Sequence, residues 1–336
     1  MPTMSYEQIL KELQSGQYRP VYLLMGEEPY FIDVITDYIA NNALQEHEKA
    51  FNQTVVYGKD TTIYAVIDAA KRYPMGAARQ VVIVKEAQSL KDIDQLHYYA
   101  EKPLQSTILV VAYKYKTLDK RLKLYKVLEK SAVVLESKKL YEDKIPDWID
   151  KYLSGSGYTI VPAASKLLSD HLGVDLGKVA NELDKLMIVL SGSKERQITP
   201  EHIERNVGIS KDYNVFELQN ALSEKNVLKA NRIVNHFEAN PNENPMVMVI
   251  STLFGYFVKV LSYHYLTDKS KAATALKINP YFVRQYEAAA HKYPAAKVVN
   301  IISILREYDL KSKGAEGTMS ATNGDLMREM VFKILH

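Results

Sequence analysis

The chain has 336 residues, of which 47% are hydrophobic and 25% are charged, and it contains no cysteine. This length and balance exclude a wholly disordered chain and suggest about two folded domains, with room for a third. The absence of cysteine excludes disulfides, thiolate zinc sites, iron–sulfur clusters and thiol nucleophiles. A formal net charge of +3 is too small to indicate a polyanionic partner by itself.

Neither the start of the chain nor its most apolar stretch predicts a membrane segment. The first ten residues lack a basic end followed by an apolar run, so they do not resemble a signal peptide. The most apolar stretch, residues 246–258, is too short to span a bilayer and predicts a buried helix. We therefore expect a cytoplasmic protein with no membrane partner.

The first third of the chain alternates strand and helix patterns. Short apolar runs predict strands at residues 21–25, 52–57, 81–84, 108–112 and 132–135. Helical patterns lie between them, and one has Pro29 near its first turn. Strands separated by helices predict a parallel sheet with helices on its faces. The expected fold over residues 1–140 is an α/β domain.

Beyond residue 140 the strand patterns stop and helical patterns fill the chain. Pro146 and Pro200 each occupy the first turn of an expected helix, where a missing N–H costs nothing. We predict two all-α domains, a small lid-like one over residues 141–210 and a C-terminal one over residues 211–336.

The turn after the first expected strand is where a phosphate-binding loop would lie. Such a loop uses glycines so that backbone N–H groups face the phosphates, followed by a lysine and a Ser or Thr. Here the turn reads Gly26-Glu27-Glu28-Pro29-Tyr30. The two carboxylates suit the positive end of a helix but would repel a triphosphate. Nucleotide binding at this turn is therefore not expected.

The third expected strand leads to the same conclusion. Residues 81–90 read Val-Val-Ile-Val-Lys-Glu-Ala-Gln-Ser-Leu, which is similar to the AAA+ ATPase pattern of four apolar residues followed by Asp-Glu-Ala. Lys85 replaces the aspartate that holds magnesium, and a cation cannot ligate a cation. Glu86 remains, but a general base without metal or phosphate has nothing to activate. The fourth strand ends in Tyr113-Lys114 instead of a polar sensor.

No other catalytic pattern is found in the sequence. The eight histidines do not lie at metal-ligand spacings, and a Gly-x-Ser-x-Gly nucleophile elbow is absent. We therefore expect no catalytic residue, no cofactor and no metal site in this chain.

The segment Tyr73-Pro74-Met75-Gly76, just before the third strand, has two interpretations. An apolar loop tip is either packed on its own domain or offered to a partner. The sequence leaves both open.

Two basic segments are equally ambiguous. Residues 114–130 carry seven Lys and Arg beside an expected apolar helical face, which indicates either a DNA or acidic-protein footprint or a solvated helix. Lys311 and Lys313 precede Gly314 at an expected helix end. There they either favour the helix dipole or contact a phosphate backbone.

Four segments occur in order from Pro20 to Gly314. They are residues 20–32, residues 79–87, Asn-Glu-Leu-Asp-Lys-Leu at 181–186 and Asp-Leu-Lys-Ser-Lys-Gly at 309–314. Together they resemble the delta subunit of the bacterial DNA polymerase III clamp loader.

The resemblance implies a three-domain subunit that does not hydrolyse ATP and works in DNA replication. Its α/β domain would be of the AAA+ or RecA-like kind. Its third domain would pack in a collar with gamma/tau-type and delta-prime-type loader subunits. Its first domain would bind the ring-shaped sliding clamp (beta) through an apolar tip and open the ring for loading onto primed DNA. Any nucleotidyltransferase activity would belong to the polymerase holoenzyme of which the chain is a subunit.

The resemblance also assigns candidate site residues. The clamp-binding tip corresponds to Tyr73, Pro74, Met75 and Gly76. The family usually has a large apolar residue at the position of Gly76, so the contact would fall more on the other three.

Candidate DNA contacts lie in the last domain. Tyr281 is a candidate stacking residue, and Lys311 and Lys313 are candidate phosphate contacts.

Two alternatives remain beside this interpretation. One is a divergent AAA+ ATPase with an unorthodox nucleotide site. The other is a nucleic-acid-binding helical protein that uses residues 114–130 and is unrelated to clamp loading. Neither alternative explains the four ordered segments.

Overall fold

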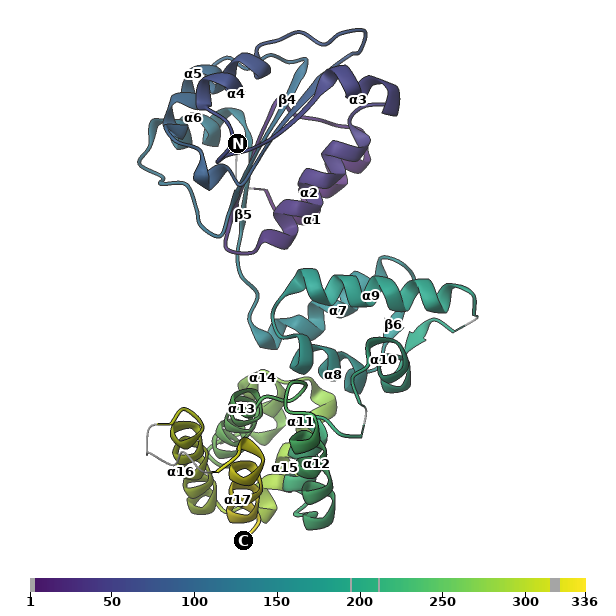
Figure 1. Cartoon of the computed structure of the whole chain (residues 1–336), viewed down its shortest axis with the longest axis vertical. Helices are drawn as coiled ribbons and strands as arrows, with labels where there is room; N and C mark the ends of the chain where they lie inside the picture. The colour runs from purple at the N-terminus through teal and green to yellow at the C-terminus, as the bar shows by residue number, and fades with distance from the viewer. Residues whose placement is uncertain (1–3, 194, 211, 315–320) are drawn as a thin grey trace. The chain divides into compact units, whose positions relative to one another are not determined.

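The protein folds into two compact units, Met1–Leu140 and Tyr141–His336. The computed structural model describes residues 4–193, 195–210, 212–314 and 321–336 (Figure 1).

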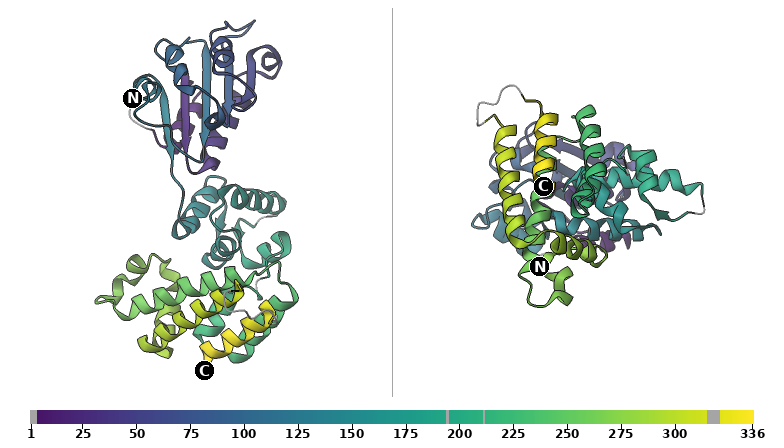
Figure 2. Two further views of the ribbon diagram at one scale, coloured as in Figure 1. Left: turned by 60° about the vertical axis from the view of Figure 1, so that its left-hand side comes forward. Right: turned by 90° about the horizontal axis from the view of Figure 1, so that it is seen from below.

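The first unit is built on a five-stranded parallel sheet, as the sequence predicts. The strand order is β2-β3-β4-β1-β5, and Figure 2 shows the strands side by side. The strands are β1 Val21–Gly26, β2 Gln53–Tyr57, β3 Gln80–Lys85, β4 Thr107–Lys114 and β5 Val133–Ser137. β1 is buried along its whole length because helices cover both faces of the sheet, which explains its unbroken apolar run.

Two cores lie on the two faces of this sheet. On one face, α1 Tyr6–Gln14 and α2 Pro29–Asn42 pack on alternate side chains of the strands, including Tyr22 and Leu24. On the other face, Leu23 and Met25 belong to the second core. That core is covered by α4 Ile63–Ala70, α5 His97–Ala100 and α6 Lys123–Ser131 (Figure 1). Shorter elements connect these: α3 Glu46–Asn52, η1 Ala87–Ser89 and η2 Ile93–Leu96.

The second unit is mostly helical. Its first elements are η3 Glu142–Lys144, α7 Ile145–Ser154, α8 Pro162–Leu172, α9 Leu176–Ser191 and α10 Pro200–Val207. Between them, β6 Thr159–Ile160 pairs in parallel with β7 Gln197–Ile198. The expectation of no strands beyond residue 140 is therefore wrong at this point, because a two-residue strand is too short to show a period in the sequence.

The remaining helices share one core. They are α11 Val215–Ser223, α12 Val227–Ala239, α13 Met246–His264, α14 Ala272–Leu276, α15 Val283–Lys292, α16 Ala295–Ser312 and α17 Asn323–Leu335, with η4 Lys269–Lys271 and η5 Pro280–Phe282. All members of this core cluster lie between Val215 and Leu335. A further domain boundary near residue 210 stays a prediction.

Helix α13 is a long, apolar helix of the second unit. At 19 residues it is longer than the expected 246–258 segment, and by length and composition it could cross a membrane. Eight of its residues are buried in the core of the second unit. A core helix meets the same criteria, so this helix is weak evidence for a membrane span.

Candidate functional site

The apolar tip before β3 is exposed. Tyr73 is 75% exposed and Met75 is 68% exposed, while Pro74 is half-buried. The interpretation of this segment as a loop packed on its own domain is therefore wrong. Gly76 has φ +65° and open space where a Cβ would lie, so its backbone conformation favours glycine. This accounts for a glycine where a large side chain was expected.

A buried asparagine holds the tip in place. Asn52, at the end of α3, is only 3% exposed. Its Nδ2 donates to the Met75 carbonyl oxygen at 3.0 Å, and its Oδ1 accepts from the Met75 N–H at 2.6 Å. The side chain thus pairs with Met75 as a neighbouring strand would. Met75 is presented to solvent on a fixed backbone.

Two further buried polar side chains secure the base of the loop. Gln80 Nε2 donates to Thr107 Oγ1 at 2.9 Å and to the Ala69 carbonyl oxygen at 3.2 Å. Thr107 Oγ1 in turn donates to the Ala70 carbonyl oxygen at 2.9 Å. These bonds tie the end of α4 to the first residues of β3 and β4. Sequence reasoning missed all three supports, although polar residues at the starts of apolar strands are a usable signal.

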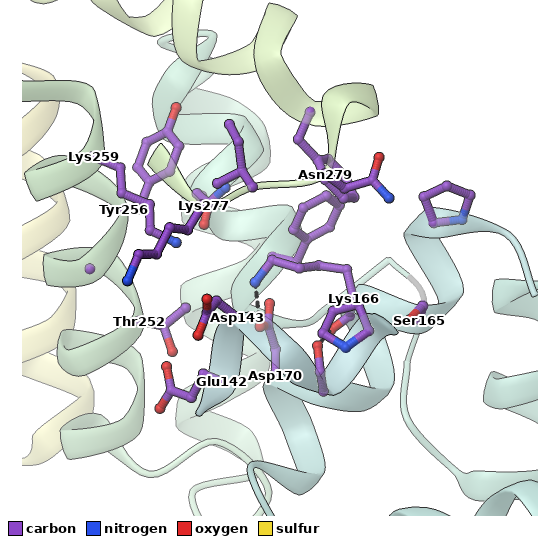
Figure 3. A pocket seen from close by; sticks show the side chains of 18 of the residues that line it. Glu142, Asp143, Ser165, Lys166, Asp170, Thr252, Tyr256, Lys259, Lys277 and Asn279 are labelled. Carbon is purple, nitrogen blue, oxygen red and sulfur yellow. Dashed lines mark hydrogen bonds and ion pairs between the residues drawn. The ribbon is translucent and has the colours of Figure 1, made fainter. Parts of the chain in front are cut away.

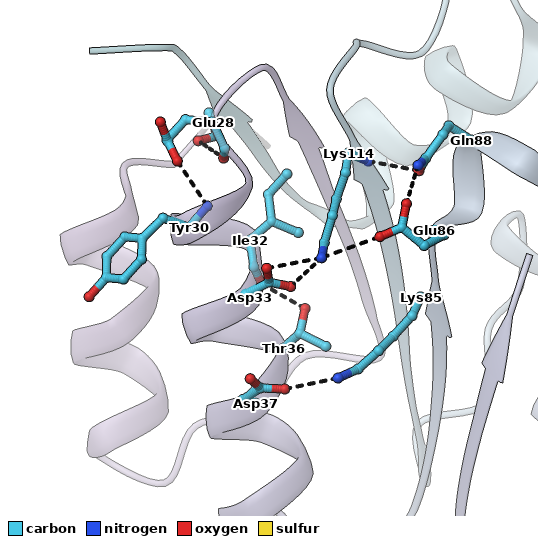
Figure 4. A network of polar contacts seen from close by, with 11 residues as sticks. Glu28, Tyr30, Ile32, Asp33, Thr36, Asp37, Lys85, Glu86, Gln88 and Lys114 are labelled. Carbon is cyan, nitrogen blue, oxygen red and sulfur yellow. Dashed lines mark hydrogen bonds and ion pairs between the residues drawn. The ribbon is translucent and has the colours of Figure 1, made fainter. Parts of the chain in front are cut away.

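Backbone donors of the turn after β1 are already bonded within the protein. The Gly26 N–H donates to the Lys116 carbonyl oxygen at 3.1 Å, and the Glu27 N–H donates to that of Ser137 at 2.9 Å. The Tyr30 N–H donates to Glu28 Oε1 at 3.0 Å (Figure 4). A phosphate-binding loop needs such N–H groups to be available. Here the protein itself occupies them.

A lysine lies where the ends of β3 and β4 meet the first turns of α2. Lys114 Nζ is 2.7 Å from Asp33 Oδ1 and 3.4 Å from Glu86 Oε1, and its side chain is only 12% exposed (Figure 4). Burial acts to lower the pKa of Lys114, but the hydrogen bond and charge of Asp33, with the charge of Glu86, raise it overall. Glu86 is thus paired with an ammonium instead of a metal ion.

Lys85, which replaces the expected metal-binding aspartate, pairs elsewhere. Its Nζ lies 3.1 Å from Asp37 Oδ1 on α2 (Figure 4). Within the described residues, no group of three or more His, Asp or Glu side chains could hold a metal ion.

The basic segment 114–130 does not form one helix, contrary to expectation. Only its last part belongs to α6, which begins at Lys123. Lys120 pairs with Glu136 at 3.0 Å, and Lys123 pairs with Glu101 at 2.9 Å. Neighbouring carboxylates therefore offset part of its positive charge.

The candidate DNA contacts lie in the second unit, where Lys313 is exposed but the Lys311 side chain is only 16% exposed. Tyr281, in η5, is exposed and lies edge-on to Phe282. At the end of α16, Lys311 donates to Glu307 at 2.6 Å and Lys313 donates to Asp309 at 2.7 Å. Both bonds join residues four apart on one helix face. A phosphate would have to compete with these carboxylates, and DNA contact stays a prediction.

A cleft of about 980 Å³ lies in the second unit (Figure 3). Helices α7 and α8 form one wall, and α13, α14 and α15 form the other. Lys166 pairs with Asp170 on α8, and burial together with the charge of Lys166 lowers the pKa of Lys259 on α13. Glu142 and Asp143 add negative charge. The lining of the cleft therefore carries both signs of charge.

Comparison with known proteins gives consistent matches along the chain. The family model described as "DNA polymerase III, delta subunit" matches residues 22–138, and the model of the "DNA polymerase III delta subunit, C-terminal domain" matches residues 212–322. The chain is 25% identical over 319 residues to the DNA polymerase III subunit delta of Bacillus subtilis (strain 168), covering 91% of each chain.

One solved structure is similar over nearly its whole length. It is the Bacillus subtilis DNA clamp loader delta protein (YqeN), with a TM-score of 0.56 and 22% identity, and 98% of this chain and 99% of that chain are covered. At this identity the likeness concerns the fold, and it agrees with an α/β unit followed by helices.

Proposed function

This chain belongs to the DNA polymerase III delta subunit family, and from that premise we propose that it binds the sliding clamp (beta) through Tyr73, Pro74 and Met75 and opens the ring for loading onto primed DNA. The observation that supports this most is the pair of exposed apolar side chains on a backbone fixed by Asn52. Burying each such side chain contributes roughly 1.5–3 kcal/mol, which is the range of interface hot spots.

We propose further that the chain does not hydrolyse ATP. The paired N–H groups of the β1–α2 turn and the ion pair between Lys114 and Glu86 support this, because groups that would contact phosphate or magnesium at this place are already bonded within the protein. The chain would instead respond to ATP binding in neighbouring subunits, with its tip favouring the open form of the ring. A ligand shifts an equilibrium only by its different affinity for the two states.

The proposed neighbours are gamma/tau-type and delta-prime-type loader subunits. Helix α13 supports this, because it is apolar on its exposed side as well as on its buried side. Val247, Phe254 and Val258 are exposed at spacings of seven and four residues, which places them on one face. DNA contact through Tyr281, Lys311 and Lys313 and a cytoplasmic location belong to the same proposal.

The test is binding of the full-length chain to the sliding clamp of its own organism. The double variant Tyr73→Ala/Met75→Ser should bind about a hundredfold more weakly, because it removes two side chains that the clamp would bury. Equal binding by the variant and the unaltered chain would reject the tip as the clamp site.

Two measurements on the isolated chain separate the alternatives. Magnesium and ATP should leave its melting temperature unchanged, whereas a rise would favour the divergent ATPase. Strongly salt-dependent DNA binding without affinity for the clamp would favour the nucleic-acid-binding protein.

A further inference from the structure

Another exposed apolar residue lies next to the tip in the fold, although it is distant in sequence. Phe51, on α3, is 74% exposed and immediately precedes Asn52, whose side chain holds Met75. Single exposed apolar residues are ordinary on protein surfaces. This one is unusual because its neighbour is bonded to the segment proposed to bind the clamp.

The register of the sheet brings the end of α3 and the tip to the same end of the strands. β2 and β3 are parallel, with Gln53 opposite Val81. β2 and β3 therefore begin at the same end of the sheet. Helix α3 leads into β2, and the tip leads into β3. The two Asn52–Met75 bonds, at 2.6 and 3.0 Å, connect the segments directly.

The area of a protein interface indicates that the tip alone is insufficient. A stable interface buries about 800 Å² on each partner, whereas a large aromatic side chain buries roughly 150–250 Å². Tyr73 and Met75 provide only part of this area, so the contact must continue onto neighbouring surface. Phe51 offers apolar area there, held on a backbone that needs no ordering when the partner binds.

We propose that Phe51 is a second anchor for the sliding clamp and contacts the ring together with Tyr73 and Met75. This inference rests on the proposed function, because it names the same partner. The partner that would cover Phe51 is the clamp, because Phe51 is next to Asn52 in the chain and the Asn52 side chain is bonded to Met75 in the tip.

Tyr64 provides a matched control on the same unit. It is an exposed aromatic residue, 66% exposed, in the first turn of α4. The tip follows the other end of α4. Tyr64 lies six residues before Ala70, the last residue of α4, which is about 9 Å along the helix. Tyr64 thus has an exposure similar to that of Phe51 but lies away from the end of the strands that carries the tip.

The experiment measures the affinity of the full-length chain for the clamp of its own organism. Phe51→Ala should weaken binding about tenfold, Tyr64→Ala should leave it within about twofold, and Tyr73→Ala/Met75→Ser should weaken it more than Phe51→Ala does. Because Phe51 is exposed, urea unfolding of Phe51→Ala should match that of the unaltered chain. A photocrosslinking residue at position 51 should also capture the clamp.

The outcomes distinguish the inference from the proposed function. Unchanged binding by Phe51→Ala, with binding lost in the tip variant, overturns the inference and leaves the tip assignment standing. Equal weakening by Phe51→Ala and Tyr64→Ala also overturns it, because the effect is then not local. Unchanged binding by the tip variant overturns the proposed function, and the inference with it.

Discussion

At the scale of single residues, buried polar side chains decide where the exposed tip is held. Asn52→Ala would leave the N–H and carbonyl of Met75 without their partners. We expect a loss of about 1–3 kcal/mol in the free energy of unfolding, together with weaker clamp binding. Urea unfolding and clamp affinity measure the two effects.

The control for Asn52 is Asn42→Ala. Asn42 makes one exposed bond, from Nδ2 to the Tyr38 carbonyl oxygen at 2.8 Å. Surface substitutions of this kind change stability by about 0.5 kcal/mol or less. An Asn52 variant as stable as the Asn42 variant would contradict the role assigned to Asn52.

Gly26 illustrates a glycine retained for packing. Its φ is +139°, and a Cβ there would lie 1.9 Å from the Ser137 carbonyl oxygen. We expect Gly26→Ala to destabilise the chain by about 3 kcal/mol or more, because strain and overpacking add. Gly192→Ala is the control, since Gly192 has an ordinary helical φ of −78° and no atom within 4 Å of the Cβ position. Equal stability of the two variants in urea would refute this account.

At the scale of elements, the buried apolar face of helix α13 should affect stability, whereas its exposed apolar face should affect assembly. Phe257 is fully buried, whereas Phe254, three residues earlier, is 46% exposed. We expect Phe257→Ala to lower the free energy of unfolding by about 3–5 kcal/mol, because it leaves a cavity in the core.

The exposed face of α13 should behave differently. Phe254→Ser should lower the free energy of unfolding by less than Phe257→Ala does, because Phe254 is already 46% exposed, and it should reduce incorporation into the loader complex, because it removes apolar area from the proposed subunit contact. Reconstitution with the other loader subunits, followed by size-exclusion chromatography, measures this. Full incorporation of the Phe254 variant would argue against α13 as a subunit contact.

At the scale of the whole molecule, buried tyrosines link stability to alkaline pH. Burial raises the pKa of Tyr22 to about 12, and it also raises the pKa values of Tyr256, Tyr286 and Tyr293. In the unfolded chain tyrosine ionises near pH 10. The stabilisation is therefore complete below about pH 10 and is lost as the pH rises toward the folded pKa values.

The corresponding measurement is urea unfolding between about pH 8 and pH 11. Above pH 10 each buried tyrosine should contribute a loss of up to about 1.4 kcal/mol per pH unit. Tyr286→Phe should reduce the slope, because phenylalanine has no proton to lose. A free energy of unfolding that stays constant across this range would show that these tyrosines do not ionise on unfolding.

Much of the fold follows from local pattern. The five strands of the sheet, the change to helices beyond residue 140 and the departure of the Gly26–Tyr30 turn from a phosphate loop are all readable in the sequence. Each of these features depends on the periodicity or the type of residues within a few positions, and such local preferences are retained in the folded chain. The four ordered segments indicated the family that the comparisons then identified.

Contacts between distant residues were decided only by the tertiary structure. Lys114 reaches Asp33 across 81 positions, Ser137 reaches Glu28 across 109 and Asn52 reaches Met75 across 23. The sequence alone also could not determine whether the Tyr73–Met75 segment is exposed, or that the basic segment 114–130 is divided. These outcomes depend on the register and order of the strands, which bring chain segments together irrespective of their separation and which no local pattern encodes.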